Sequence, residues 1–145
     1  MTDDLSPHRF ERALPLGAAE AFAVYVDRIG EWWDPRYTAN ADSLVGVTIE
    51  QQVGGRAYAM HSDMGRDDWG EILVWEPGLR LVHTFTLAQD PAHPSEISAE
   101  FEDRGGGSVL QFAHGGWTVE NARDRAKFGE WPLLLDRFAA LAGSL

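Results

Sequence analysis

The chain has 145 residues, a formal net charge of −11 at pH 7 and no cysteine. The length predicts one domain, residues 1–145, that buries a core without cross-links. The lack of cysteine excludes disulfides and thiolate metal sites, and the acidic balance argues against nucleic acid or an anionic membrane surface as a partner. No apolar run approaches the length of a membrane span and the N-terminal residues are acidic and polar, so we expect a soluble, cytoplasmic protein.

Two short elements precede the main body of the chain. Residues 8–14 have extended character, which Pro15 ends. Residues 17–29 carry an apolar face at helical spacing, and this predicts a helix that Gly30 closes. The Trp32-Trp33 pair follows, and Pro35 then stops any helical continuation. Residues 36–46 have no clear period and are expected to form a loop.

Residues 47–117 change to a period of two, with turn signals at regular intervals, and this predicts six antiparallel strands. Tight turns at residues 54–55 and 77–78 and a turn in the triple glycine 105–107 would fix the register. The expected pairs are Ile49–Met60, Gln51–Tyr58, Ile72–His83, Val74–Leu81, Phe101–Leu110 and Ala99–Phe112. Placing Tyr58 opposite Ile72 and Leu87 opposite Ile97 continues the same alternation of inward and outward side chains across the sheet.

This register separates an apolar inner face from a polar outer face, as a sheet covered on one side requires. The inner face also carries four polar side chains: Gln51, Tyr58, His83 and His114. The outer face carries His61, with Arg80 across from Trp75 as a cation–π pair. Four apolar residues also fall on the outer face, and we expect them to form an exposed patch that meets a second copy in a homodimer: Trp69, Leu73, Trp75 and Val82.

The C-terminal residues 131–145 predict an amphipathic helix. Its apolar stripe consists of Trp131, Leu134, Leu135, Phe138, Leu141 and Ala142. Pro132 suits the first helical turn and Gly143 suits the C-terminus. The polar segment 118–128 is compatible with helix but out of phase with this stripe, so we expect a break near residues 129–132.

Five segments, taken in order, resemble one known family: IGEWWDP, VGGRAY, GEILVWEPGLRLVHTF, FEDRGGGSVLQFAHGGW and WPLLLDRFAAL. They resemble the START-like (SRPBCC, helix-grip) superfamily, and within it the homologues of the activator of heat-shock protein 90 ATPase. The chain departs from that subgroup at Glu130, which separates Gly129 from Trp131. The resemblance implies an α+β helix-grip fold: a curved antiparallel sheet of about seven strands around a long C-terminal helix, with two short helices near the N-terminus. It also implies a cavity between sheet and helix that binds an apolar small molecule.

We expect ligand-binding residues on the inner sheet face, on the last helix and among the tryptophans. The candidates are Trp33, Gln51, Tyr58, Met60, Ile72, His83, Phe85, Phe101, Phe112, His114, Trp117, Trp131 and Leu135. Trp32 and Trp33 would cover one end of the cavity, and Trp117 and Trp131 the other. The register places His83 about 10 Å from Tyr58 and about 16 Å from His114. His83, Tyr58 and Gln51 would orient the polar end of a ligand, whereas His114 would cap a turn at its strand end.

Two alternatives remain open at this stage. One is an enzyme of the cyclase or hydrolase type, in which His83 acts as general acid or base and Tyr58 as a donor. The other is a chaperone-associated or other protein-interaction domain. The sequence has no metal-ligand spacing, no GxSxG and no phosphate loop, so we expect no metal and no cofactor.

Overall fold

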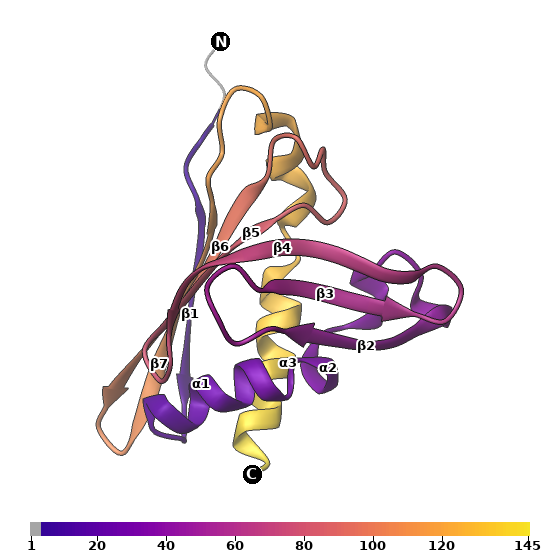
Figure 1. Cartoon of the computed structure of the whole chain (residues 1–145). Helices are drawn as coiled ribbons and strands as arrows, with labels where there is room; N and C mark the ends of the chain where they lie inside the picture. The colour runs from indigo at the N-terminus through magenta and orange to yellow at the C-terminus, as the bar shows by residue number, and fades with distance from the viewer. Residues whose placement is uncertain (1–3) are drawn as a thin grey trace.

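The protein is described by a computed structural model of residues 4–145, in which seven strands form one antiparallel sheet (Figure 1). The strand order across the sheet is β1-β7-β6-β5-β4-β3-β2. The strands are β1 (His8–Leu14), β2 (Leu44–Ile49), β3 (Arg56–His61), β4 (Gly65–Glu76), β5 (Arg80–Phe85), β6 (Ser95–Arg104) and β7 (Gly107–Gly115).

The curled sheet wraps around the C-terminal helix, which is drawn in yellow in Figure 1. The α-helices are α1 (Ala18–Asp27), α2 (Ile29–Trp32) and α3 (Trp131–Gly143), and three 3-10 helices lie at η1 (Pro35–Tyr37), η2 (Ala41–Ser43) and η3 (Ala122–Phe128). This α+β helix-grip arrangement confirms the fold that the resemblance implied. None of the helices within residues 4–145 combines the length and the hydropathy needed to span a bilayer.

The apolar stripe of α3 holds this helix against the concave face of the sheet. Trp131, Leu134, Leu135, Phe138 and Ala142 are buried. The Phe138 ring lies 5.4 Å from that of Tyr25 and 6.3 Å from that of Phe101, so the helix touches both α1 and β6. Each large side chain buried in this way contributes roughly 1.5–3 kcal/mol. The expected break is also confirmed, because η3 ends at Phe128 and α3 begins at Trp131.

The predicted register is correct for three pairs, whereas Val74 pairs with Val82 rather than with Leu81, and Tyr58 pairs with Asp68 rather than with Ile72. Ile72 lies opposite His83, Phe101 opposite Leu110 and Ala99 opposite Phe112. The last two pairs follow from a two-residue turn, since Arg104 is paired with Gly107 and only Gly105 and Gly106 connect them. A short turn fixes the register of both strands of a hairpin, which is why glycine spacing was sufficient here.

The predicted register is wrong between β2 and β3. Ile49 pairs with Ala57 rather than with Met60, and Tyr58 pairs with Thr48 rather than with Gln51. The connection is a longer loop, in which the Glu50 amide donates to the Arg56 carbonyl. A shift by an odd number of residues moves every side chain of a strand to the other face. The buried residues of β3 are therefore Ala57, Ala59 and His61, and Tyr58 and Met60 belong to the outer face.

A bulge-like shift in β4 corrects the expected outer patch. Where β4 pairs with β5, the register shifts between Ile72 and Val74. Where β4 pairs with β3, it shifts between the residues paired with Ala57 and with Tyr58. An extra residue in a strand turns the following side chains to the other face. As a result Trp69 is only 2% exposed and Trp75 packs 5.3 Å from Phe22, while Val82 on β5 is buried as well. Of the four patch residues only Leu73 is exposed, so the predicted dimer surface does not exist in this form.

Two further register expectations are corrected along β5. The strand ends at Phe85, so Leu87 does not pair with Ile97. Ile97 instead pairs with His83 on one side and His114 on the other. The two histidines therefore share one row of the sheet, two strands or about 10 Å apart, rather than the expected 16 Å.

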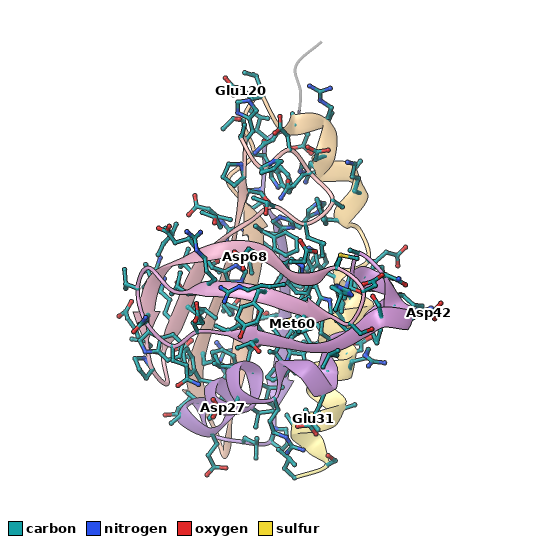
Figure 2. The ribbon with its side chains drawn as sticks, turned by 45° about the vertical axis from the view of Figure 1, so that its right-hand side comes forward. Asp27, Glu31, Asp42, Met60, Asp68 and Glu120 are labelled. Carbon is teal, nitrogen blue, oxygen red and sulfur yellow. The ribbon has the colours of Figure 1, made fainter. Side chains whose placement is uncertain are left out.

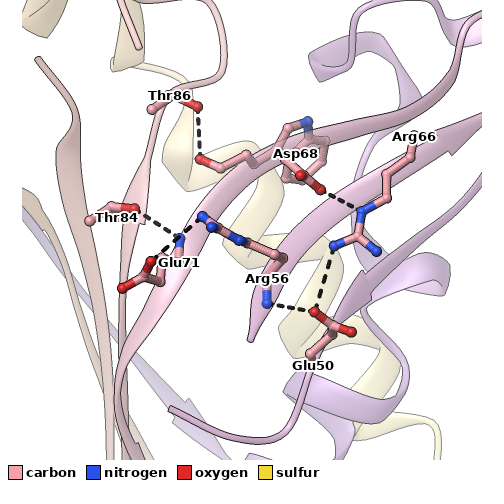
Figure 3. A network of polar contacts seen from close by, with 8 residues as sticks. Glu50, Arg56, Arg66, Asp68, Glu71, Thr84 and Thr86 are labelled. Carbon is pink, nitrogen blue, oxygen red and sulfur yellow. Dashed lines mark hydrogen bonds and ion pairs between the residues drawn. The ribbon is translucent and has the colours of Figure 1, made fainter. Parts of the chain in front are cut away.

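The outer face of β3 and β4 carries a network of charged side chains (Figure 3). The Arg66 guanidinium lies over the Tyr58 ring at 3.9 Å and pairs with Asp68 and Glu50. Arg80 pairs with Glu100 at 3.1 Å, which replaces the expected contact with Trp75. Exposed pairs of this kind stabilise by about 0–1 kcal/mol each, so the network mainly keeps this face solvated.

Gly70 is required where β4 lies closely against its neighbour β5. A Cβ atom at this position would lie 1.8 Å from the Thr84 carbonyl oxygen, which is backbone and has no room to move. We expect Gly70→Ala to lower the free energy of unfolding by about 3 kcal/mol, measured by urea denaturation. Gly46→Ala is the matched control on β2, because nothing lies within 4 Å of the added atom. Equal stability of the two variants would contradict the close approach of Gly70 to the Thr84 backbone.

Candidate functional site

A cavity of about 540 Å³ opens beside the N-terminus of α3. Four segments line it: residues 33–39 after α2, residues 67–68 of β4, residues 85–91 at the end of β5, and residues 127–134 from η3 into α3. The volume lies within the range of small-molecule sites, roughly 300–1,000 Å³. The cavity therefore occupies the break between η3 and α3.

Aromatic rings form the apolar wall of this cavity. Trp33, Phe85 and Trp131 lie within 6.4 Å of one another by ring centroids, and all three line it. Trp69 packs behind them at 4.8 Å from Trp33, with its indole N–H buried and unpartnered among the described residues. Trp33 and Trp131 were expected at opposite ends of the cavity. They meet in one cluster because α2 packs against α3.

Trp117 and Trp32 support this wall from outside. Trp117 stacks on Phe128 at 5.9 Å and donates its indole N–H to the His114 carbonyl. Trp32 is buried and donates to the Tyr25 carbonyl. Phe128 lines the cavity, so Trp117 acts by supporting it, and neither Trp117 nor Trp32 reaches the cavity itself.

His114 joins the sheet to the first turn of α3. The Trp131 indole donates to His114 Nδ1 at 3.0 Å, so the ring carries its proton on Nε2. That Nε2–H donates to Ser95 Oγ at 2.7 Å, and Ser95 donates onward to the Phe85 carbonyl. Burial lowers the His114 pKa to about 3, and a proton added at Nδ1 would also meet the Trp131 N–H. The His114 ring is fully buried and is not accessible to a ligand. Through its hydrogen bond it positions Trp131.

His83 is also buried and does not line the cavity. Its Nδ1 donates to the Thr84 carbonyl at 2.7 Å. Burial lowers its pKa, and the bond to Thr84 opposes that shift. His83 therefore lies in the sheet as a neutral side chain behind Phe85, whose ring is 6.3 Å away.

The other predicted ligand residues lie elsewhere. Gln51 donates to Asp27 at the surface, and Tyr58 lies under Arg66. Met60 is 37% exposed and sits on the strand face turned away from α3 (Figure 2). The core residues Ile72, Phe101, Phe112 and Leu135 are buried without lining the cavity. Of the thirteen candidates, the structure brings Trp33, Phe85 and Trp131 to the cavity.

Charged residues at the mouth of the cavity were missed by the sequence analysis. They are Arg36, Asp67, Asp68, Lys127 and Glu130. They come from segments without hydrophobic periodicity, so only the insertion of Glu130 between Gly129 and Trp131 marked the region in the sequence. Within residues 4–145, no group of three His, Asp or Glu side chains is arranged to hold a metal ion.

Two cations at the mouth are held by carboxylates. Asp34 accepts from Arg36, at 2.7 Å in the closest contact, and this bond lowers the pKa of Asp34 and raises that of Arg36. The charge of Glu130 adds a smaller contribution at Arg36. Lys127 pairs with Asp124 at 2.6 Å and donates to the Ala88 carbonyl at 2.9 Å. Ala88 has φ of +59°, unusual for a residue with a side chain, so this contact fixes a strained loop at the mouth.

Comparison with known proteins places the chain in a family. The family model of activator of Hsp90 ATPase homolog 1-like proteins matches residues 18–143. The chain belongs to this family. No curated protein matches the sequence.

Solved structures of similar fold cover nearly the whole chain. Protein MLL2253 from Mesorhizobium loti is 23% identical with a TM-score of 0.69, covering 94% of this chain and 96% of its own. The Aha1 dimer from Colwellia psychrerythraea is 13% identical with a TM-score of 0.67, covering 92% and 93%. Txn09, an anthrahydroquino-γ-pyrone synthase solved with a bound ligand, is 26% identical with a TM-score of 0.62, covering 97% and 99%.

The neutral state of His114 predicts a dependence of stability on pH. Its pKa is about 3 in the folded protein and about 6.5 when unfolded. Below pH 6.5 the unfolded chain binds a proton that the folded chain does not, so the free energy of unfolding decreases as the pH is lowered. Between about pH 7.5 and pH 5 the loss is about 2 kcal/mol from this group.

We expect His114→Gln to remove this component of the pH dependence, measured by urea unfolding at about pH 7.5 and pH 5. His93→Gln, on an exposed loop residue, should retain the dependence of the parent protein. Identical pH dependence in the His114 variant and the parent would contradict the buried neutral state.

Proposed function

We propose that the protein binds an apolar small molecule in the cavity beside the N-terminus of α3. The observation that carries the proposal is the wall formed by Trp33, Phe85 and Trp131 around about 540 Å³ of space. These three side chains are only 1–4% exposed, so a ligand in the cavity gains free energy mainly by removing its own apolar surface from water.

The size of the cavity limits the expected affinity. A two-ring aromatic ligand that buries roughly 250 Å² of apolar surface gains about 6 kcal/mol. Loss of translational and rotational freedom offsets part of a larger gross interaction. We therefore expect dissociation constants on the order of 10–100 μM for simple two-ring probes.

The enzymatic alternative loses its geometric basis. Tyr58 lies on the outer face, and His83 is buried behind Phe85 with Nδ1 bonded to the Thr84 carbonyl. These two residues therefore do not meet at the cavity. Although Txn09 is a synthase, its activity transfers to this chain only with a matching set of residues, because one fold supports many functions.

The interaction alternative has lost the surface on which it was based. Trp69 and Val82 are buried in the structure, so they do not offer a docking patch. The Colwellia relative is a dimer, but at 13% identity it supports the fold alone. Ligand binding is therefore the function that this cavity favours.

The proposal predicts stoichiometric binding of the neutral dye N-phenyl-1-naphthylamine, detected by its fluorescence increase. Ala39 is exposed and lines the cavity, so Ala39→Trp should fill the mouth and weaken binding by about tenfold. Ala19→Trp is the matched control, because Ala19 is an exposed alanine that lines a separate groove between α1 and β4.

Two outcomes would contradict the proposal. One is the absence of saturable dye binding at one site per chain. The other is equal loss of binding in the Ala39 and Ala19 variants, which would indicate binding outside the cavity. Circular dichroism of each variant confirms that the fold is retained.

A further inference from the structure

The charges around the cavity are unbalanced in favour of carboxylates. The lining includes three acidic residues, Asp67, Asp68 and Glu130, and two basic residues, Arg36 and Lys127. The ion-pair partners of these groups add Asp34, Asp124 and Arg66. Five carboxylates thus face these three cations, and the charge of Arg137 also acts on Asp34, which leaves a formal charge of −1 to −2 at the mouth.

Two carboxylates account for this excess. Each cation at the mouth has its own carboxylate: Asp34 for Arg36, Asp68 for Arg66 and Asp124 for Lys127. The side chains of Asp67 and Glu130 take part in no ion pair or hydrogen bond with any residue from 4 to 145, although the charge of Glu130 acts weakly on Arg36. They lie on different elements, β4 and the residue before α3, and both line the same cavity.

The position of Glu130 makes it available to a ligand. It is the N-cap residue of α3, yet its side chain makes no capping hydrogen bond. The helix N-terminus contributes only about half a positive charge, which does not offset the excess at the mouth. The overall charge of −11 also favours the approach of cations over anions.

We infer that the ligand of this cavity is a cationic amphiphile, an aromatic or other apolar body that carries an amine. This inference rests on the proposed function and deepens it by naming the class of ligand. The apolar body lies against Trp33, Phe85 and Trp131, and the ammonium group lies at the mouth between Asp67 and Glu130. Indole rings also attract a cation held over their faces, so wall and mouth favour the same class.

An anionic ligand is the main competitor, and the geometry disfavours it. Its charge would meet cations whose positive charge is already offset by Asp34 at Arg36 and by Asp124 at Lys127. It would also approach Asp67 and Glu130, and like charges without compensation oppose binding.

Three matched probes test the charge preference: 2-naphthylmethylamine, 2-naphthylmethanol and 2-naphthoate, which share one ring system. Each is measured by displacement of N-phenyl-1-naphthylamine from the intact protein. At low salt we expect the amine to bind about three- to tenfold more tightly than the alcohol, with the carboxylate weakest. Raising NaCl from about 10 mM to about 300 mM should reduce the preference, because the mouth is exposed to solvent.

Substitutions at the mouth test whether the preference for the amine comes from the mouth carboxylates or from the net charge of the whole protein. The double variant Asp67→Asn with Glu130→Gln should bring the amine within about twofold of the alcohol, while the affinity for the alcohol stays unchanged. The control Glu20→Gln with Glu120→Gln removes the same amount of charge at exposed positions that do not line the cavity. It should retain the preference for the amine.

The possible failures are distinguishable. Equal affinity of amine and alcohol, or equal effects of the two double variants, would overturn the cationic class and leave apolar binding intact. Absence of dye binding would overturn the proposed function and this inference together. Tighter binding of 2-naphthoate than of the alcohol would identify an anionic ligand instead.

Discussion

The hydrogen bond from the Trp131 indole to His114 Nδ1 links the two halves of this protein. On one side is the end of β7, and on the other is the first turn of α3. The bond requires a neutral imidazole, and burial together with the Ser95 contact maintains that state. With Trp131 fixed in this way, α3 begins at a defined place on the concave face of the sheet, and its apolar stripe packs into the core.

The cavity is a consequence of that entry point. Polar η3 cannot continue the apolar stripe of α3, so the chain breaks between Phe128 and Trp131 and leaves space beside the break. The end of β5, the segment after α2 and the start of β4 surround this space. Their aromatic side chains form its wall, whereas their loop residues bring charge to its mouth. The apolar wall and the charged mouth thus have different structural origins.

Much of the fold was predictable because it depends on local periodicity. The stripe from Trp131 to Ala142 defined α3, and the turn at Gly105 and Gly106 fixed the pairing of β6 with β7. The site was less predictable. Tyr58, Met60 and Gln51 were placed inside by assuming a two-residue turn, whereas the longer loop from Glu50 to Arg56 reverses the faces of β3. A pattern with a period of two contains no information on loop length, so such an error inverts a whole strand.

The sequence by itself determined the order of helices and strands, the break before α3 and the aromatic character of the candidate site, because periodicity and residue type act over short stretches of chain, whereas the helix-grip arrangement was implied by the family resemblance. Only the tertiary structure decided which aromatic residues meet. Trp33, Phe85 and Trp131 are far apart in sequence, and their contact depends on the packing of α2 and β5 around α3. It also decided that Asp67 and Glu130 share one mouth, since long-range pairing of strands and helices sets distances that no local pattern encodes.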